Sequence, residues 1–174
     1  MNYLNKFFNK STLDTVKNKK LKGLWITNIQ LYPSLHGCSV YTRFITKELC
    51  KHSDLDLLYY IDNDVYEKNP RLHLAHLKNI YYVEKLKNIN KPLLKDGLNN
   101  YSNIVQKKLV DWIQKKFKTQ KYDFVVCDYV YLSKIFDFIP NNVVKVINTH
   151  DHYGDRHIGL NWDDEQRKKA FCIT

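Results

Sequence analysis

The chain has 174 residues, a size that predicts one domain with a hydrophobic core of its own. Hydrophobic residues account for 44% and charged residues for 26% of the sequence, a balance that is ordinary for a globular protein and excludes wholesale disorder. The net charge is +10, but 24 of the 28 basic residues are Lys and only four are Arg, the residue best suited to bidentate phosphate and base contacts. The charge therefore favours attraction to an anionic membrane surface or a sugar phosphate, and no nucleic-acid partner is expected.

The first 20 residues are predicted to be a separate helical or flexible segment, in which five Lys alternate with hydrophobic residues. No signal-peptide core follows its basic start, and no apolar run in the chain reaches the roughly 18 residues that a membrane-spanning helix needs. Four scattered cysteines, without a CxxC pair, are typical of reduced thiols rather than of a disulfide framework. We therefore expect a cytoplasmic protein whose residues 21–174 form one domain.

Short runs of apolar residues after this segment predict β-strands. The strands are expected at residues 24–29, 55–61, 80–83, 124–127 and 143–148, and a further strand begins at 171–174. The run at 143–148 is expected to be a buried strand. Strands that are apolar throughout and alternate with helices are typical of a parallel, doubly wound sheet, so we predict an α/β, Rossmann-like domain with helices on both faces.

Apolar residues recur at helical spacing between these strands. Helices are expected at residues 39–52, 71–77, 98–118, 130–138 and 162–170, and residues 84–97 are expected to form a basic loop. Ser39 is placed to cap the first helix. The helix at 98–118 carries an apolar stripe that includes Ile104, Leu109 and Ile113, and we expect this stripe to face the core.

The segment after the fifth strand combines several residue types that can carry chemistry. It contains His150, Asp151, His152, Asp155, Arg156 and His157. In open parallel sheets, ligands bind outside the carboxyl ends of the strands, where loops and helix N-termini meet. We therefore expect the strand at 143–148 to deliver these side chains to a binding site.

The turn after the first strand is a second candidate site. It lacks the GxGxxG pattern of dinucleotide-binding domains, but it contains Pro33 and Gly37 and opens a helix that carries Arg43. A glycine in front of a helix can let a phosphate approach the N–H groups of the helix N-terminus. The turn is therefore a candidate for contact with a phosphorylated ligand.

Together, the two segments resemble the N-terminal domain of GT-B glycosyltransferases, particularly the family-4-like retaining enzymes. The resemblance runs over roughly residues 22–174, and it is carried mainly by Ile147-Asn148-Thr149-His150-Asp151 and Gly154-Asp155-Arg156-His157. It implies the acceptor-side half of a two-domain architecture, because the second Rossmann-like domain, which holds the nucleotide, is missing from the 174 residues. It also implies a place in bacterial polysaccharide assembly.

The resemblance implies roles for two of the candidate residues. His150, which ends the late strand, would lie beside the transferred sugar and act in catalysis. Gly37 and its neighbours would contact the donor diphosphate or the acceptor. Family members often have two adjacent glycines in this turn, whereas this chain has Gly37 followed by Cys38.

The chemistry of sugar transfer suits the remaining candidates. The reaction passes through an oxocarbenium-like state, and it needs polar groups near the anomeric carbon and cationic groups near the leaving phosphate. Arg43 and Arg156 are expected to contact phosphate or an acidic acceptor, since arginine pairs well with such groups. Asp151 and Asp155 are expected to orient these residues or to bind acceptor hydroxyls, with Asp151 as the second catalytic residue.

The expected partners follow from the resemblance. They are a nucleotide-sugar donor, a glycan or lipid-linked acceptor, and either a second copy or a separate donor-binding subunit that completes the enzyme. No cofactor and no metal are expected, and the domain alone is expected to be inactive. The acceptor and the basic loop residues would suit a peripheral position at the inner face of the cytoplasmic membrane.

Two other functions remain open. The cluster from His150 to His157 holds enough nitrogen and oxygen ligands for the metal site of a metal-dependent hydrolase. Alternatively, a half-enzyme whose crevice face is uncovered can serve as a noncatalytic binding or assembly module, because exposed apolar surface recruits partners.

Overall fold

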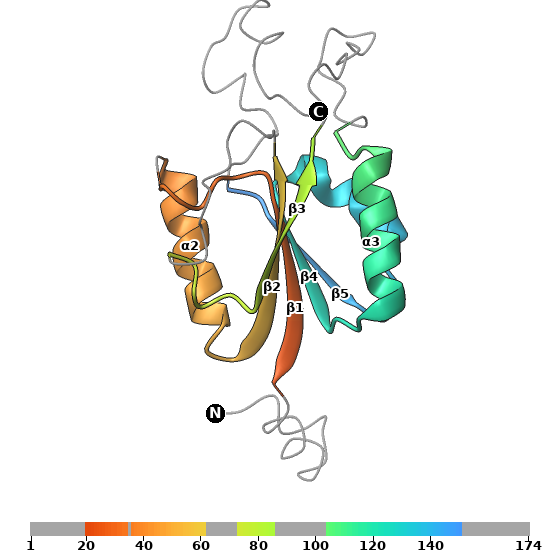
Figure 1. The fold of residues 1–174 in the computed structure, drawn as a ribbon, viewed down its shortest axis with the longest axis horizontal. Helices are drawn as coiled ribbons and strands as arrows, with labels where there is room; N and C mark the ends of the chain where they lie inside the picture. The colour runs from red at the N-terminus through yellow and green to blue at the C-terminus, as the bar shows by residue number, and fades with distance from the viewer. Residues whose placement is uncertain (1–19, 35, 62–72, 86–103, 151–174) are drawn as a thin grey trace, which may run out of the picture.

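The computed structural model describes residues 20–34, 36–61, 73–85 and 104–150, which form five strands and three helices (Figure 1). The elements are β1 (Leu21–Thr27), α2 (Gly37–Leu49), β2 (Ser53–Ile61), β3 (Asn79–Glu84), α3 (Lys107–Thr119), β4 (Phe124–Asp128), the 3-10 helix η4 (Val130–Phe138) and β5 (Val144–Asn148). No helix in these ranges is both long and apolar enough to cross a membrane.

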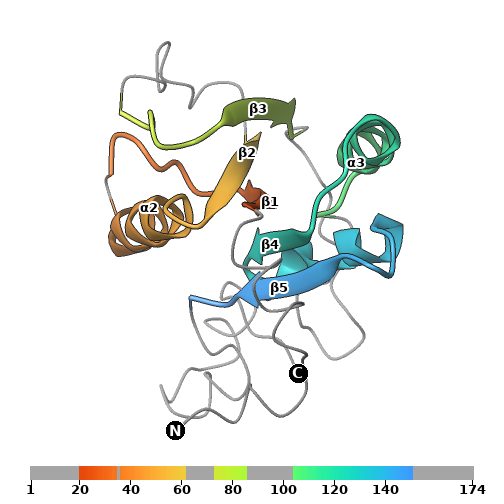
Figure 2. The same cartoon turned by 90° about the horizontal axis from the view of Figure 1, so that it is seen from below.

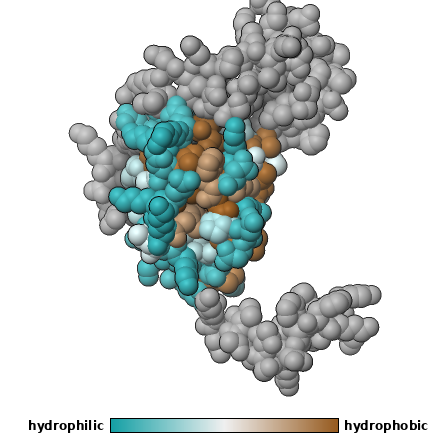
Figure 3. Space-filling model, turned by 90° about the vertical axis from the view of Figure 1, so that its right-hand side faces the viewer, coloured by the Kyte–Doolittle hydropathy of each residue, from teal (hydrophilic) through white to brown (hydrophobic). Residues whose placement is uncertain are grey.

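The five strands form one parallel sheet in the order β3-β2-β1-β4-β5. Helix α2 covers one face, whereas α3 lies on the opposite face (Figures 1 and 2). The α3 side carries mostly hydrophilic side chains around a band of hydrophobic ones (Figure 3). This arrangement confirms the predicted α/β, Rossmann-like fold with helices on both faces.

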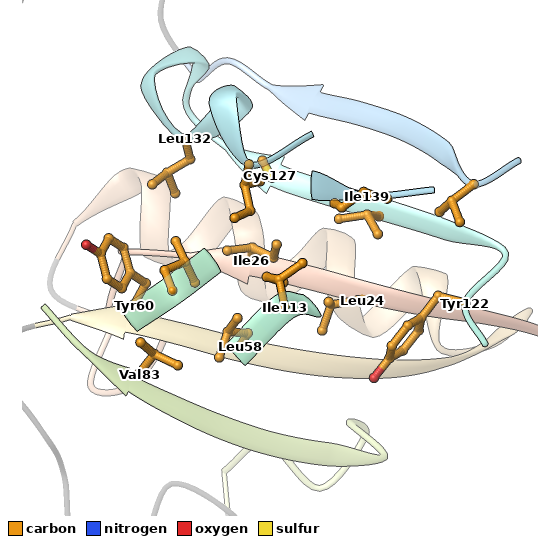
Figure 4. Close-up of a cluster of buried hydrophobic side chains, with 14 of the residues drawn as sticks. Leu24, Ile26, Leu58, Tyr60, Val83, Ile113, Tyr122, Cys127, Leu132 and Ile139 are labelled. Atoms are coloured by element: carbon orange, nitrogen blue, oxygen red, sulfur yellow. The ribbon is translucent and has the colours of Figure 1, made fainter. Parts of the chain in front are cut away.

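The sheet is stable because its strands are apolar on both faces. Along β1, Leu24 and Ile26 point to the face of α3, where they pack with Ile113 of α3 and Leu132 of η4 (Figure 4). Trp25 points the other way and packs in the cluster under α2. Each such side chain contributes about 1.5–3 kcal/mol by leaving water, so the two layers together account for the sheet's position between the helices.

Helix α2 begins earlier than predicted, at Gly37 rather than Ser39, and ends at Leu49 rather than at residue 52. Its N-cap residue is His36, which makes no side-chain capping bond. Ser39 is 1% exposed, inside the first turn, and it therefore does not cap the helix as predicted. Residues 50–52 form a turn instead, in which the Cys50 N–H still bonds to the carbonyl of Thr46.

Helix α3 is shorter than the predicted helix at 98–118, because it begins at Lys107. Residues 104–106 are not helical, and the Ile104 carbonyl accepts a 2.7 Å hydrogen bond from the Tyr60 hydroxyl of β2. This tertiary bond holds the chain in front of the helix. Leu109 and Ile113 are fully buried, so the predicted stripe faces the core as expected. Residues 98–103 lie outside the described ranges.

Three further predictions about local structure differ from the structure. The predicted helix at 71–77 is absent from its described part, where residues 73–77 form turns. The predicted helix at 130–138 is present, but it has 3-10 geometry. The first strand lies at 21–27 rather than at 24–29, because it pairs with β2 from Leu21 onward. The elements predicted at 162–170 and 171–174, and the segment 1–19, lie outside the described residues.

The strand predicted to be buried at 143–148 is an edge strand in the described sheet. Strand β5 pairs with β4 alone, and none of its five residues is buried. Val144 is 61% exposed, Val146 43% and Ile147 38%. Apolar sequence alone does not distinguish an edge strand from a central one, because both faces of a strand can be apolar whether or not a neighbour covers them.

Candidate functional site

The carboxyl ends of β4 and β5 bring a histidine and an aspartate together. Asp128 is the last residue of β4, and His150 follows the end of β5 by two residues. His150 Nε2 lies 2.9 Å from Asp128 Oδ1. The side chains are 3% and 0% exposed, respectively, so the pair is shielded from water. Asn148 Nδ2 lies 3.0 Å from the same nitrogen. The short distance to a carboxylate favours the tautomer in which Nε2–H donates to Asp128, and in that tautomer Nδ1 carries the lone pair.

Asp128 is fixed by two further hydrogen bonds. The indole N–H of Trp25, on β1, donates to Oδ2 at 2.8 Å. The side-chain amide of Asn148, at the end of β5, donates to Oδ1 at 2.8 Å. Both carboxylate oxygens therefore accept donors, as a buried charge requires. The three strands β1, β4 and β5 thus determine where the imidazole of His150 lies.

Helix α2 and the β4 end complete the surroundings of the ring. Thr42, which is fully buried, places Oγ1 3.3 Å from His150 Nε2. The rings of Tyr41 and Tyr129 lie 5.7 Å and 4.9 Å from the imidazole, centroid to centroid. The aromatic rings restrict the imidazole to one orientation and lower the local polarity, which strengthens its hydrogen bond to Asp128.

The backbone is strained at both strand ends that form this site. Tyr129 has a φ of 65° and His150 a φ of 57°, in the left-handed region that side-chain-bearing residues rarely adopt. Such a conformation costs on the order of 1–3 kcal/mol and persists only where surrounding contacts hold it. It clusters at functional sites, and these two residues follow neighbouring strands and touch each other.

Asn28, directly after β1, adds an unusual polar group to the same sheet edge. Its amide nitrogen donates to the Tyr131 hydroxyl at 2.9 Å. Its Oδ1 is the single buried side-chain oxygen or nitrogen without a hydrogen-bond partner in the described part of the chain. An unpaired buried acceptor costs about 1–3 kcal/mol, so this edge of the sheet holds unused hydrogen-bonding capacity.

The predicted residues Gly37 and Arg43 take different positions. Gly37 opens α2 at the carboxyl edge, and a Cβ added there would meet nothing within 4 Å. A larger side chain would therefore fit at this position. Arg43 instead stacks on the far side of α2, with its guanidinium carbon 5.6 Å from the centroid of the Tyr32 ring. No described contact brings Arg43 to His150.

Three predicted residues, Asp151, Asp155 and Arg156, lie outside the described residues, as do His152 and His157 of the possible metal cluster. Within residues 20–34, 36–61, 73–85 and 104–150, no group of three His, Cys, Asp or Glu side chains is arranged to hold a metal ion. A cavity of about 190 Å³, lined by residues that include Leu74 and Ile80, lies where β3 begins and thus at the other edge of the sheet.

Cys127 is not part of the reactive set. It precedes Asp128 on β4 but points to the opposite face of the sheet, into the core under α3. Burial raises the pKa of the Cys127 thiol well above its usual range, and the charge of Asp128 raises it further. The thiol therefore stays protonated and behaves as a small hydrophobic side chain.

The sequence predicted His150 but not the residues that position it. Asp128 could have been found, because it directly follows a predicted strand and therefore lies at a carboxyl end of the sheet. Strands β4 and β5 are neighbours, which brings this end close to His150. Trp25 and Thr42 carry no such signal, because each lies in an apolar or helical run and takes part through tertiary packing. The strained backbone of Tyr129 is likewise invisible in the sequence.

Comparisons with known proteins bear on the fold. No family model matches the chain, and no curated protein matches it. Among solved structures, the chain is similar to the C-terminal domain of a hydrogenase from Pyrococcus furiosus, with a TM-score of 0.51 and 15% sequence identity over 74% of this chain and 92% of that one. At this identity the likeness shows a shared α/β, Rossmann-like fold and nothing about activity.

Proposed function

We propose that the chain is the acceptor-side half of a GT-B-like glycosyltransferase, which transfers a sugar from a nucleotide-sugar donor to a glycan or lipid-linked acceptor. A donor-binding domain, on another part of the protein or on a separate subunit, would complete the enzyme. The observation that carries the proposal is the His150 imidazole held by buried Asp128 at the carboxyl edge of the sheet. This edge is where open α/β sheets bind ligands.

The geometry suits contact with a sugar hydroxyl. With Nε2–H donating to Asp128, Nδ1 of His150 carries a lone pair that accepts a hydrogen bond or a proton. The carboxylate stabilises the imidazolium that forms if a proton is taken, as in other His–carboxylate pairs. A positioned general base of this kind contributes roughly 10²–10⁴-fold in rate.

The neighbouring groups support the same assignment. Helix α2 begins at Gly37, and Thr42 of the same helix lies 3.3 Å from His150 Nε2, so the positive end of the helix dipole is near the ring. A leaving diphosphate needs a positive group of this kind. The unpaired Asn28 oxygen is an acceptor that a sugar hydroxyl would satisfy after a small side-chain shift.

Titration calorimetry of the full chain with nucleotide diphosphate sugars, free nucleotides and acceptor oligosaccharides tests the proposal. We expect a sugar ligand to bind, and His150→Ala to weaken its binding by about 10-fold or more, since a hydrogen bond to such a site is worth about 1.5 kcal/mol. His52→Ala is the matched control, because His52 is an exposed histidine in the turn after α2. Binding by none of the sugars, or equal loss in both variants, would contradict the proposal.

A noncatalytic assembly module is the second candidate, and the exposed edge strand favours it. The side chains of Val144, Val146 and Ile147 are exposed, so both faces of β5 are only partly covered. Edge strands of this kind can pair with another chain. A module without catalysis would show partner binding that depends on β5 and no response of His150 to sugars.

A further inference from the structure

The two long helices of the domain differ in what they show to solvent. Both have 13 residues and lie on opposite faces of the sheet (Figure 1). Helix α3 exposes no large hydrophobic side chain, whereas α2 exposes three, at 57%, 50% and 59%. These are Val40, Tyr41 and Phe44, hereafter the α2 patch. An ordinary surface helix places such residues against the core, so the α2 patch indicates a contact surface.

The α2 patch is continuous on the helix surface. Residues 40, 41 and 44 are separated by one, three and four positions, which places them on one side of a helix. The buried side chains of α2, Ser39, Thr42 and Thr46, lie on the opposite side. The inner side of α2 thus combines these small hydroxyl side chains with Ile45 and Leu49, which pack against the cluster that contains Trp25, while the outer side carries the α2 patch.

Cationic side chains flank the α2 patch. Arg43 lies within it in sequence, and Lys47 follows in the last turn of the helix. Neither forms an ion pair in the described part of the chain, and Lys51 pairs with the sole acidic residue of α2, Glu48, at 2.6 Å. The field of these cations is felt nearby, since Arg43 and Lys47 both help to lower the pKa of His76, after the larger effect of burial.

We propose that the outer surface of α2 docks the domain on an anionic lipid bilayer, with Val40, Tyr41 and Phe44 inserted at the level of the headgroups and Arg43 and Lys47 beside them. Amphipathic helices that lie in the membrane interface combine these features: exposed aromatic and aliphatic side chains, unpaired cations and a place on the protein surface.

The charge of the chain favours an anionic bilayer over a second copy of the chain as the partner of the α2 patch. The chain carries a net charge of +10, so two copies repel each other as they approach. The same charge attracts the anionic leaflet, with about 1 kcal/mol for each Lys or Arg near its surface. A lipid surface therefore fits this patch better than self-association does.

Docking through α2 would also specify the acceptor, a point that rests on the proposed function. Tyr41 belongs to the α2 patch and lies 5.7 Å from the His150 ring. The candidate site would consequently sit next to the bilayer, where the hydroxyl or phosphate of a lipid-linked acceptor is found. A free soluble glycan would gain nothing from this placement.

Co-sedimentation of the full chain with vesicles tests the docking without any donor or acceptor. We expect binding to vesicles of phosphatidylcholine that contain about a third phosphatidylglycerol, and at least 10-fold weaker binding to phosphatidylcholine alone. Binding to the anionic vesicles should weaken as the salt concentration rises, because counterions screen the lysines and the arginine.

Two phenylalanine variants provide the matched comparison. Phe44→Asp should weaken vesicle binding by about 10-fold or more, since it removes an inserted aromatic ring and adds a negative charge. Phe138→Asp should leave it unchanged, because Phe138 is exposed on η4, which packs on the α3 face. Both positions are on the surface, so circular dichroism should report intact folds.

Three outcomes would overturn the proposal: no binding to anionic vesicles, equal loss in both variants, or a dimer in solution that Phe44→Asp dissociates while vesicle binding stays absent. His150→Ala separates this inference from the proposed function. Vesicle binding that survives His150→Ala, in a chain that responds to no sugar, would retain the docking and reject the transferase.

Discussion

Two buried aspartates, Asp56 within β2 and Asp128 at the carboxyl end of β4, have different hydrogen-bond partners. Asp56 of β2 accepts the Tyr122 hydroxyl at 2.7 Å and the Asn79 side-chain amide at 2.7 Å. Burial, and next the hydrogen bond to Asp56, raise the pKa of Tyr122, so the phenol stays a donor. Asp128 of β4 is equally buried but lies at the carboxyl edge.

The partners of Asp128 differ in kind. Alongside the donors Trp25 and Asn148, it contacts His150, a side chain whose ring nitrogens can donate or accept a proton. The backbone is strained at His150 and at the adjacent Tyr129, whereas no positive φ occurs next to Asp56 among the described non-glycine residues. Asp56 therefore stabilises the fold within the sheet, whereas Asp128 orients His150 at the carboxyl ends of the strands.

The largest expected effect is a difference in sugar transfer between variants of the two aspartates. Asp128→Asn removes the charge that holds His150 Nε2–H, and we expect it to lower sugar transfer about 100-fold or more. Asp56→Asn should leave transfer within a few-fold of the starting protein, because Asp56 contacts no group at the carboxyl edge. Turnover of both folded variants, measured with the donor-binding domain supplied, makes the comparison, and equal losses would contradict it.

The stability of the fold should depend on buried Asp56 but not on its exposed neighbour Asp54. Asp56→Ala removes the acceptor of the Asn79 amide and the nearer of two acceptors of the Tyr122 hydroxyl, which keeps Gln120 Oε1 at 3.1 Å. We expect it to lower the free energy of unfolding by about 1–3 kcal/mol. Asp54→Ala, two positions earlier, should change it little, because the ion pairs of Asp54 with Lys20 and Lys78 are on the surface. Urea unfolding of the two variants measures the difference, and similar losses would show that the Asp56 contacts are not structural.

Backbone strain at the carboxyl edge should appear as a reversal of the usual order of alanine and glycine. At most positions glycine is the less stable replacement, but glycine adopts a φ of 65° without strain. We therefore expect the free energy of unfolding of Tyr129→Gly to be about 1 kcal/mol higher than that of Tyr129→Ala. Tyr131→Gly and Tyr131→Ala, on the adjacent helix η4, should keep the ordinary order. An ordinary order at both sites would remove strain from the description of the edge.

The smallest effect comes from a histidine that belongs to neither edge. Burial, with smaller contributions from Arg43 and Lys47, lowers the pKa of His76 below its ordinary value of about 6.5. Between these two pKa values the unfolded chain binds more protons than the folded chain, so the free energy of unfolding falls as the pH decreases through that window. In His76→Gln this part of the pH dependence should disappear. Urea unfolding at pH values on either side of 6.5 tests it, and an unchanged pH dependence would assign the effect to another group.

The sequence predicted the sheet well because parallel strands covered on both faces must be apolar throughout. Residues 57–61 of β2 and 124–127 of β4 have this pattern, and the order of strands and helices followed from it. Helix ends were less predictable, since Tyr60 holds Ile104 out of α3 and Ser39 turns inward. Both differences arise from tertiary contacts that spacing along the chain does not contain.

The site was predictable only where it depends on a strand end. His150 follows an apolar run directly, so its place at the carboxyl edge could be inferred. Its orientation could not, because Asp128 and Trp25 come from strands more than twenty residues away in sequence. The exposure of β5 was also missed, since covering of an edge strand depends on what lies beside it rather than on its own residues.

The proposed role of His150 depends on which ring nitrogen carries the proton and on whether the other one contacts a ligand. Nitrogen-detected NMR of the histidine-labelled full chain measures both directly. The seven histidines are few enough to assign, with His150→Gln identifying the resonances of interest. We predict that Nε2 carries the proton in the free protein, and that Nδ1 shifts when a nucleotide sugar or an acceptor oligosaccharide is added. A proton on Nδ1 with Nε2 bare, or an Nδ1 resonance that responds to none of these ligands, would contradict the assignment of a sugar-transfer site.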